Sequence, residues 1–248
     1  MQIIISPAKT MREDTDSFDI AGLPRFLPQT RQILSVLRAM RPDELQALWK
    51  CSDSIAELNI HRLERMNLER LLTPALLTYD GIQYQHMAPG IFEQAQYDYL
   101  QEHLRILSGF YGILRPFDGV TPYRLEMQAK LPVDGCKDLY AFWGSRLADA
   151  LAAESSTILN LASKEYSKAV EPHLPEHVRF ITCTFAQRKA EKLVERATMC
   201  KMARGQMVRW LAERQITEAE DAQGFDELGF CFSPEHSSGN DFVFIKEE

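Results

Sequence analysis

The spacing of apolar positions along this chain predicts a sheet of short strands separated by helices. Residues 2–5 are a short run rich in β-branched side chains that closes at Ser6-Pro7, which is typical of a buried strand. Residues 178–185 alternate polar and apolar side chains and predict the clearest strand of the chain. Further strands are expected over residues 75–79, 104–107, 157–161, 230–232 and 242–245.

Apolar residues recur at helical spacing in the segments between these strands. Ile33, Leu34 and Leu37 share one face of a helix over residues 29–40, which ends before Pro42 because a proline disfavours helix in the residue before it. A second helix is expected to begin at Pro42-Asp43-Glu44. Other helices are expected over residues 52–67, 137–154 and 163–170. A long amphipathic helix from about residue 189 is expected to bury Leu193, Val194, Ala197, Met207 and Leu211.

Strands and helices alternate along the chain without an internal repeat or a linker-like stretch. This order predicts a mixed α/β fold, either α/β or α+β in the arrangement of its sheet. We expect a single compact domain over residues 1–248 with a central mixed sheet. A helical hairpin segment, residues 29–70, is expected as an insertion inside that domain.

Composition restricts the class of protein. The chain is 45% hydrophobic and 25% charged, which is ordinary for a globular protein. No apolar stretch approaches the roughly 20 residues of a membrane-spanning helix. The N-terminus lacks the basic region and the cleavage site of a secretory signal, so we expect a cytoplasmic location.

The five cysteines predict neither disulfides nor a metal site. They are odd in number, far apart in sequence and never form a C-x-x-C pair. We therefore expect reduced thiols that pack as small apolar residues. Paired Glu-x-x-His motifs of a di-iron site are also absent, and we expect no metal and no cofactor.

Charge is unevenly distributed in a chain whose formal net charge is -7. Residues 179–214 hold nine basic and only three acidic side chains, whereas residues 215–248 hold nine acidic side chains and one lysine. Such a basic stretch predicts a local site for an anion. It also fits a solvated helix face on which Lys192 and Arg196 pair with Glu191 and Glu195.

Polar or basic residues follow or end three of the predicted strands, at residues 6–10, 108–109 and 160–166. Ligands of open α/β sheets bind beyond the carboxyl ends of the strands, so these segments are expected to converge on one cleft if the strands are parallel neighbours. Each segment taken singly also fits an ordinary loop. Lys9-Thr10 resembles the end of a phosphate loop but lacks its glycines.

Residues 45–59 follow the register of a helix-hairpin-helix motif, which binds DNA phosphates through hairpin amides and a helix N-terminus. Lys50 and Ser52 replace the usual hairpin glycines, which makes close approach of the backbone to DNA more difficult. A plain helical hairpin in the core is the alternative.

Several longer motifs together resemble one known family. They are Ser6-Pro-Ala-Lys-Thr10, Leu107-Ser-Gly-Phe-Tyr-Gly-Ile-Leu-Arg-Pro116, Pro122-Tyr-Arg-Leu-Glu-Met127, Leu139-Tyr-Ala-Phe-Trp-Gly144, Asn160-Leu-Ala-Ser-Lys-Glu-Tyr166, Ala203-Arg-Gly205 and Phe232-Ser-Pro-Glu-His-Ser-Ser238. In this order they are similar to the YaaA family over nearly the whole chain.

The resemblance implies a cytoplasmic bacterial protein of the peroxide stress response that limits damage by intracellular iron and peroxide. It also implies an unusual α/β fold with a positively charged cleft, a helix-hairpin-helix element, and binding of duplex and branched DNA. Carried over onto matching motifs, the residues implied for the cleft are Lys9, Arg115, Arg124, Asn160, Lys164 and Arg204.

The first hypothesis is a DNA-binding stress protein without catalytic turnover that contacts phosphates with little sequence preference. The sequence does not determine its oligomeric state, and a monomer is favoured. The residues expected to contact DNA are Lys50, Ser52, Arg188, Lys189, Lys192, Arg196, Lys201, Arg204 and Arg209. On a helix, Lys189, Lys192 and Arg196 would fall within an arc of about 60°. The residues expected in the cleft are Ser6, Lys9, Thr10, Ser108, Arg115, Tyr123, Arg124, Asn160, Ser163, Lys164 and Tyr166.

The second hypothesis is an enzyme or sensor that acts on a nucleotide or nucleobase in the cleft. Lys9 or Lys164 beside Glu126 or Glu165 would supply acid–base chemistry, and Tyr123 or Tyr166 would stack a base. The two hypotheses differ in the expected shape. An open groove as wide as a duplex favours DNA, and a pocket of a few hundred Å³ lined by Lys9, Arg124 and Asn160 favours a small ligand.

Overall fold

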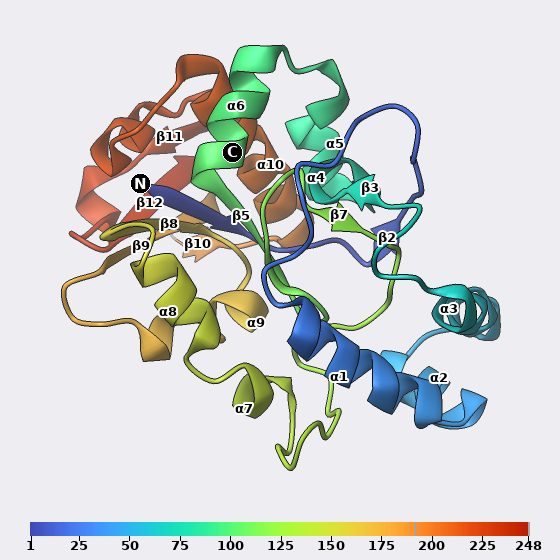
Figure 1. Cartoon of the computed structure of the whole chain (residues 1–248). Coiled ribbons are helices and arrows are strands. Elements are labelled where there is room, and N and C mark those ends of the chain that lie inside the picture. The colour runs from blue at the N-terminus through green and yellow to red at the C-terminus, as the bar shows by residue number, and fades with distance from the viewer. Residues whose placement is uncertain (191, 248) are drawn as a thin grey trace.

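A central mixed sheet organises the structure, a computed structural model that describes residues 1–190 and 192–247 (Figure 1). Its strands lie in the order β11-β12-β9-β8-β1-β5-β6, and β10 pairs with β9. Their bounds are β1 Gln2–Ile5, β5 Leu104–Ser108, β6 Gly112–Leu114, β8 Thr157–Leu161, β9 Arg179–Lys189, β10 Lys192–Val194, β11 Phe230–Phe232 and β12 Asp241–Lys246. Two short ladders stand apart from it, formed by β2 (Thr10–Met11) with β4 (Tyr79–Asp80) and by β3 (Thr73–Pro74) with β7 (Gly119–Val120).

Strand β1 lies in the middle of the sheet because its apolar side chains can be buried on both faces. Ile3, Ile4 and Ile5 are fully buried. The strand pairs in parallel with β5 on one side and with β8 on the other. Strands β8, β9 and β12 continue the parallel arrangement. The carboxyl ends of β1, β5 and β8 therefore meet at one edge of the sheet.

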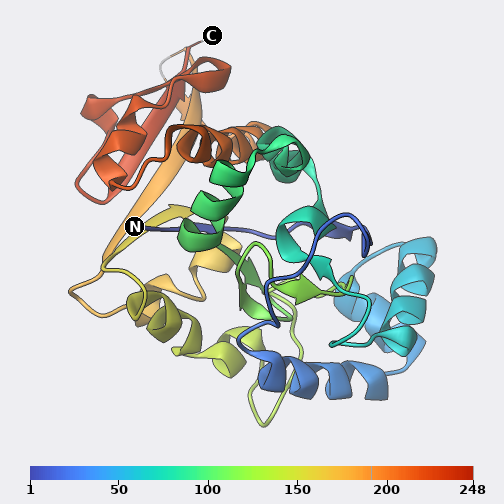
Figure 2. The same ribbon diagram turned by 45° about the horizontal axis from the view of Figure 1, so that its top comes forward.

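Helices cover both faces of the sheet. Helix α6 packs beside β1 and β5, and α10 packs beside β9 and α6, whereas α8 lies on the other side of the strands in both views (Figures 1 and 2). The α-helices are α1 Leu27–Ala39, α2 Pro42–Trp49, α3 Asp53–Arg65, α4 Ala75–Thr78, α5 Ile82–Met87, α6 Gln94–His103, α7 Leu139–Trp143, α8 Arg146–Ala152, α9 Lys164–Ser167 and α10 Ala197–Arg214. Short 3-10 helices occupy Pro89–Ile91, Glu171–His173, Ala219–Gly224, Glu227–Gly229 and Pro234–His236. In the part of the chain that is described, no helix is both long and apolar enough to cross a membrane.

The predicted mixed α/β class with a central mixed sheet is confirmed. Most predicted strands are present within a residue or two of their expected bounds. Helices α1, α2 and α3 occupy the segment expected to be helical and lie together at one end of the molecule (Figure 2).

Two local predictions are wrong. Of the strand expected over residues 75–79, residues 75–78 form the single helical turn α4, and only Tyr79 belongs to a strand, β4. The expected helix over residues 137–154 is divided at Gly144 into α7 and α8. The first segment is short and apolar, so its periodicity does not distinguish a strand from a helix. In the second, Gly144 adopts φ 50° and ends α7.

The long helix begins at Ala197 and not near residue 189. The chain turns at Ala190, where φ is 54°, and residues 192–194 pair with β9 as strand β10. Leu193 and Val194 are therefore not core residues of a helix, and Val194 is exposed. Lys189, Lys192 and Arg196 do not share a helical face, which contradicts the expected arc. Lys192, Glu195 and Arg196 therefore do not share the solvated helix face considered as the alternative. Glu191, the fourth residue of that face, lies outside the described residues.

Helix α10 approaches α5 unusually closely at Gly205. A Cβ atom built at Gly205 would lie 2.0 Å from the carbonyl oxygen of Gln83. The neighbouring buried residues of α10, among them Ala203, Met207 and Val208, complete this contact. Only glycine at position 205 therefore allows the two helices to pack this closely.

We expect Gly205→Ala to destabilise the protein. Alanine favours helix by about 1 kcal/mol over glycine, but its methyl group would force α10 and α5 apart at a cost of about 3 kcal/mol. The net loss of about 2 kcal/mol would lower the melting temperature by several degrees in thermal unfolding. Gly90→Ala is the control, because a Cβ there meets nothing within 4 Å. A Gly205→Ala melting temperature equal to that of wild type would contradict this account of the packing.

Candidate functional site

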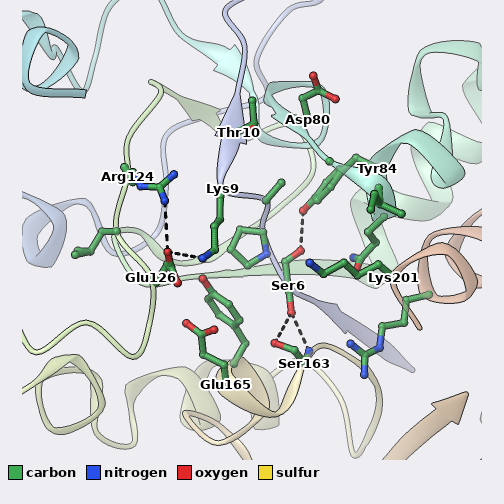
Figure 3. Close-up of a pocket in the computed structure, with 18 of the residues that line it drawn as sticks. Ser6, Lys9, Thr10, Asp80, Tyr84, Arg124, Glu126, Ser163, Glu165 and Lys201 are labelled. Carbon is green, nitrogen blue, oxygen red and sulfur yellow. Dashed lines mark hydrogen bonds and ion pairs between the residues drawn. The ribbon is translucent and has the colours of Figure 1, made fainter. Parts of the chain in front are cut away.

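A pocket of about 340 Å³ opens at the carboxyl ends of β1 and β8 (Figure 3). Its residues come from the loop after β1, from β4 and α5, from residues 123–126, from the start of α9 and from α10. The lining residues are Ser6, Pro7, Ala8, Lys9, Thr10, Asp80, Gly81, Ile82, Gln83, Tyr84, Tyr123, Arg124, Leu125, Glu126, Ser163, Glu165, Tyr166, Lys201 and Arg204.

Hydrogen bonds between Ser6 and Ser163 join the ends of the two parallel strands. The Ser163 amide donates to Ser6 Oγ at 2.8 Å, and Ser6 Oγ donates to Ser163 Oγ at 3.2 Å. The hydroxyl of Tyr84 donates to the carbonyl oxygen of Ser6 at 3.0 Å and connects α5 to the same point. These contacts fix the loop after β1 against α9 and α5.

A layer of tyrosines lies beneath the pocket. Tyr123 Oη lies 2.6 Å from Ser108 Oγ and 2.9 Å from Tyr79 Oη, and the Tyr123 amide donates to the sulfur of Met11 at 3.3 Å. Burial raises the pKa of Tyr123 to about 12 and that of Tyr79 further above its usual value. Gly109 allows the backbone of residues 125–127 to cross the end of β5, because a Cβ there would meet Leu125 O at 2.9 Å. The layer is therefore rigid and uncharged.

Ion pairs hold one side of the pocket. Lys9 Nζ lies 2.8 Å from Glu126 Oε1, and Nη2 of Arg124 lies 3.8 Å from the same oxygen. Figure 3 shows both cations directed at Glu126. Lys9 remains well exposed, whereas Arg124 is almost wholly buried.

Glu165 is a carboxyl group with an altered proton affinity beside this pair. Desolvation raises its pKa, and the negative charge of Glu126 acts in the same direction, while a hydrogen bond from the Gln128 amide and the charge of Lys9 oppose them. Burial, with the charges of Glu165 and Glu126, also raises the pKa of Tyr166. The arrangement places a carboxyl group and a neutral phenol at the pocket for proton transfer or hydrogen bonding.

Two cations from α10 complete the pocket. Lys201 lies on the other side of Ser6 from Lys9 in Figure 3, and no described carboxylate lies within 4 Å of Lys201 or Arg204. Desolvation lowers the pKa of Arg204, although its charge is retained because guanidinium groups remain protonated in proteins.

Three buried donors next to the pocket also meet no acceptor within the described residues. They are Arg124 Nε, Arg204 Nε and Gln83 Nε2. Buried N–H groups are nearly always hydrogen-bonded in native proteins. Unpaired donors and unpaired cations together favour an anionic ligand rich in acceptor atoms.

The pocket brings together seven of the residues expected in the cleft, which are Ser6, Lys9, Thr10, Tyr123, Arg124, Ser163 and Tyr166. Four others do not line it. Ser108 lies beneath it in the tyrosine layer, and Asn160 is buried, with bonds to Thr182 and to the Ala162 amide. Lys164 points into solvent, and Arg115 lies in a different pocket. The expectation that these four residues line this cleft is therefore wrong.

The basic stretch over residues 179–214 does not form one continuous strip. Arg179 pairs with Glu220, Arg188 with Glu247 at 3.1 Å, and Arg209 with Glu213 at 2.7 Å. Lys189 and Lys192 pair in register on the β9–β10 hairpin, and Arg196 is the N-cap of α10. Lys201 and Arg204 are the two members of this stretch that line the pocket.

The hairpin between α2 and α3 has an exposed loop. Lys50 adopts a left-handed conformation with φ 47°, as the glycine of such a hairpin would, and Ser52 is the N-cap of α3. Ser52 makes no capping hydrogen bond, so the first amides of α3 remain available. The presence of a DNA-binding helix-hairpin-helix element stays a prediction.

Sequence reasoning missed the contribution of residues 80–84. Tyr79-Asp80-Gly81 signalled only the end of a strand, yet Asp80, Gln83 and Tyr84 line the pocket. The Asp-Gly dipeptide that ends the strand and the polar residues after it could have indicated this contribution. The other segments of the cleft likewise place polar residues directly after a strand. Among residues 1–190 and 192–247, no cluster of three His, Cys, Asp or Glu side chains is placed to hold a metal ion.

Comparison with known proteins identifies similar sequences over the full length. The family described as peroxide stress protein YaaA matches residues 1–236. A UPF0246 protein of Lachnoclostridium phytofermentans is 51% identical over 248 residues, which cover 100% of this chain and 97% of the relative. A UPF0246 protein of Agathobacter rectalis is 49% identical over 247 residues, with 100% and 99% covered. One of Pediococcus pentosaceus is 48% identical over 248 residues, with the same coverage.

We expect Glu165→Gln to stabilise the protein at pH 7 and to have little effect at pH 4. Because the pKa of Glu165 is raised above its usual 4.5, wild type loses stability as the pH rises from below that value through the raised one. The amide is never charged and avoids this loss, which is at most about 1 kcal/mol because the carboxyl is partly open to solvent. Thermal unfolding at both pH values measures the difference.

The exposed Glu171→Gln is the control for this experiment, and its melting temperature should follow that of wild type at both pH values. An equal or larger gain for Glu165→Gln at pH 4 would contradict the argument from desolvation.

Proposed function

This chain belongs to the YaaA family of peroxide stress proteins, and from that premise we propose that it binds DNA through phosphate contacts centred on the pocket mouth. The observation that carries the proposal is the gathering of Lys9, Arg124, Lys201 and Arg204 around one concavity in a chain of net charge -7. Clustered cations attract a polyanion even when the whole protein is acidic.

The set of residues that contacts phosphate is smaller than the basic stretch of the sequence. Arg179, Arg188 and Arg209 already have carboxylate partners, so each would have to give up an ion pair to bind DNA. Lys201 lines the pocket, and the exposed Arg196 is the N-cap of the same helix, α10. Lys9, although paired with Glu126, is 64% exposed and can reach outward.

The link to peroxide stress follows from coverage of the DNA. A duplex or branched DNA held against the protein is shielded where it is contacted, which would limit the iron- and peroxide-dependent damage to those segments. Phosphate contacts carry little sequence information, so this protection would extend to many sequences.

A second candidate is an enzyme or sensor for a free nucleotide, and the shape of the pocket favours it. A volume of about 340 Å³ suits a small molecule, and Lys9, Glu126, Glu165 and Tyr166 supply groups for acid–base chemistry. The three unpaired buried donors would meet the acceptors of a base or a phosphate. Both candidates use the same cations.

We expect Lys201→Ala to weaken binding of all DNAs alike. Titration of labelled duplex and four-way junction between 50 and 200 mM salt should give a slope of the logarithmic binding constant that corresponds to at least about three neutralised phosphates. Removal of one phosphate contact should reduce that slope by about one unit. Fluorescence anisotropy measures the binding constants.

Lys137→Ala is the matched control, because Lys137 is an exposed lysine outside the pocket. Binding that does not depend on salt, or that changes equally in the two variants, would refute the proposal. Displacement of the DNA by a free deoxynucleoside monophosphate at millimolar concentration would favour the second candidate.

We expect Ser52→Asp to weaken DNA binding without loss of stability if the α2–α3 hairpin contacts phosphate. Aspartate is a good N-cap for α3 but repels a phosphate held by the same amides. Asn67→Asp, beyond the other end of α3, makes the same change of charge while keeping the bond to the Glu69 amide. Equal affinities of the two variants would place the hairpin outside the contact.

A further inference from the structure

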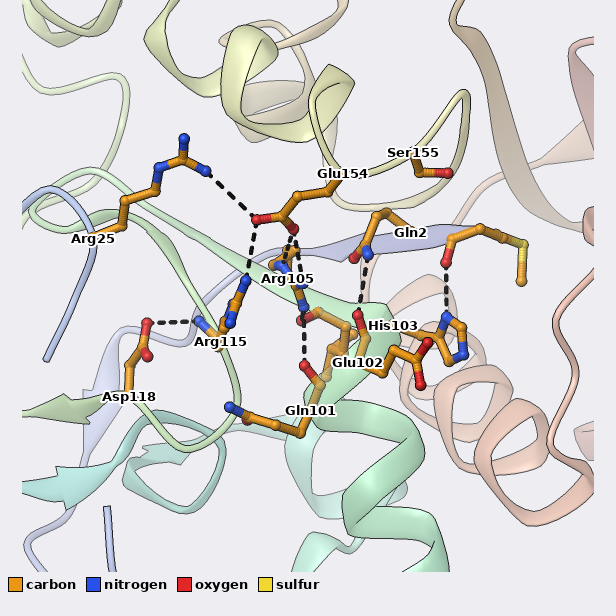
Figure 4. Close-up of polar contacts among 12 residues, drawn as sticks. Gln2, Arg25, Gln101, Glu102, His103, Arg105, Arg115, Asp118, Glu154 and Ser155 are labelled. Atoms are coloured by element: carbon orange, nitrogen blue, oxygen red, sulfur yellow. Dashed lines mark hydrogen bonds and ion pairs between the residues drawn. The ribbon is translucent and has the colours of Figure 1, made fainter. Parts of the chain in front are cut away.

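A second pocket, of about 320 Å³, lies at the opposite end of the parallel strands (Figure 4). Arg105 is near the start of β5, and Glu154 precedes β8, so both stand at the amino ends of strands whose carboxyl ends form the first pocket. Arg25 reaches it from the segment before α1, and Arg115 from the residue after β6. This pocket is independent of the site proposed for DNA.

Three guanidinium groups converge on the carboxylate of Glu154, and the deepest of them is fully paired. Arg105 is 5% exposed, and its Nε and Nη2 lie 2.8 and 2.7 Å from Glu154 Oε2. Its Nη1 donates to the carbonyl oxygens of Leu104 and Gln101. Arg105 and Glu154 therefore form a fixed base for the pocket.

Arg25 and Arg115 are held much more loosely. Each places one Nη on Glu154 Oε1, at 3.5 and 3.4 Å, and each side chain is about half exposed. Charge-assisted bonds of this kind are normally 2.7–2.9 Å long. No other side-chain acceptor is found for either guanidinium within the described residues. Most of their donors are therefore free to bind another anion.

The charges of the pocket leave a positive surplus. Its ionisable groups are three guanidiniums and the carboxylates of Glu154 and Asp118. Asp118 Oδ2 is occupied by the amide of Arg115 at 2.9 Å, which fixes the turn that carries this arginine. Burial raises the pKa of Asp118 to about 6, against the effect of the nearby arginines. Within the described residues the Asp118 carboxylate forms no ion pair within 4 Å of the Arg115 guanidinium, whose carboxylate partner is Glu154.

The remaining lining is apolar. Leu23, Ile113, Ala150 and Leu151 line the pocket alongside the arginines. Ile113, Ala150 and Leu151 are already packed in the core, whereas Leu23 is 44% exposed. An inorganic ion would leave Leu23 open to solvent, whereas an organic ligand would cover it.

We propose that this second pocket binds a small organic phosphomonoester. Arg25 and Arg115 take its dianionic phosphoryl group, whose tetrahedral oxygens match two planar forks of donors. Its organic part lies against the exposed side chain of Leu23. Glu154 acts as an internal counter-ion that the phosphoryl group partly displaces. A carboxylate ligand, with one charge, would only equal Glu154.

The experiment uses phenyl phosphate, inorganic phosphate and benzoate as probes, with isothermal titration calorimetry of the full chain at constant ionic strength. We expect wild type to bind phenyl phosphate most tightly, and the Arg25→Ala/Arg115→Ala double variant to bind it at least about tenfold more weakly, since it lacks the charge-assisted hydrogen bonds that both guanidiniums would make to the phosphoryl group. Arg31→Ala is the control, because Arg31 is equally exposed and also paired with a glutamate, Glu69.

Equal binding of phenyl phosphate by the double variant and wild type, or no binding by wild type at 10 mM, would overturn the proposal. Equally tight binding of benzoate would overturn the phosphoryl assignment, and equally tight binding of inorganic phosphate would overturn the organic part. A short DNA duplex that competes for the pocket would identify its ligand as backbone phosphate instead. Because Lys201 lies in the first pocket, Lys201→Ala should retain phenyl phosphate binding whether or not it loses DNA.

Glu154→Gln provides a test in the opposite direction. The amide still accepts a hydrogen bond from Arg105 but no longer neutralises Arg25 and Arg115, so this variant should bind phenyl phosphate several-fold more tightly than wild type. A purely structural role for the three arginines would not produce a gain. Weaker binding by a folded Glu154→Gln protein would contradict the role of Glu154 as a displaceable counter-ion.

Discussion

The contact of α10 with α5 at Gly205 is the constraint on which the first pocket depends. The two helices approach until the backbone of Gln83 occupies the space of a missing side chain. Lys201 lies one helical turn before Gly205 and on the same face, and Arg204 is its immediate neighbour. The same packing that buries the middle of α10 therefore directs two cations at the carboxyl ends of the strands.

The polar groups of the pocket are hydrogen-bonded to one another, so their burial costs the core little stability. The parallel strands end in Ser6 and Ser163, which bond to each other, and Tyr123 is held beneath them by Ser108 and Tyr79. Every hydroxyl in this network has a partner, so the network is stable without a ligand. The cations of α10 are the part that a ligand would complete.

Much of the fold and part of the site could be predicted from the sequence. The apolar run of β1 requires burial on both faces, which makes it a central parallel strand, and a parallel arrangement brings Ser6 and Ser163 to one edge. Which of the polar residues at the strand ends are buried and which face the pocket could not be predicted. Asn160 lies near the carboxyl end of β8, as a ligand-binding residue would, but its side chain is hydrogen-bonded to Thr182 and to the Ala162 amide.

The positions of the charged side chains in space could not be predicted from the local sequence pattern, for a different reason. Leu193 and Val194 fit a helix as well as a strand, and pairing with β9 decides between them. The carboxylate that neutralises Arg188 lies 59 residues away, at Glu247. A basic stretch in sequence thus becomes a set of separate ion pairs once distant segments meet.

The sulfur of Met11 has a consequence for a member of a family of peroxide stress proteins. It accepts the amide of Tyr123 and so helps to hold residues 123–126 at the pocket, yet a thioether is readily converted to a sulfoxide. Met11 is only 3% exposed, and oxidant can reach it only when the surrounding segment opens. The rate at which Met11 is oxidised is therefore set by the rate and extent of that local opening. The packing around Met11 protects the pocket from oxidation.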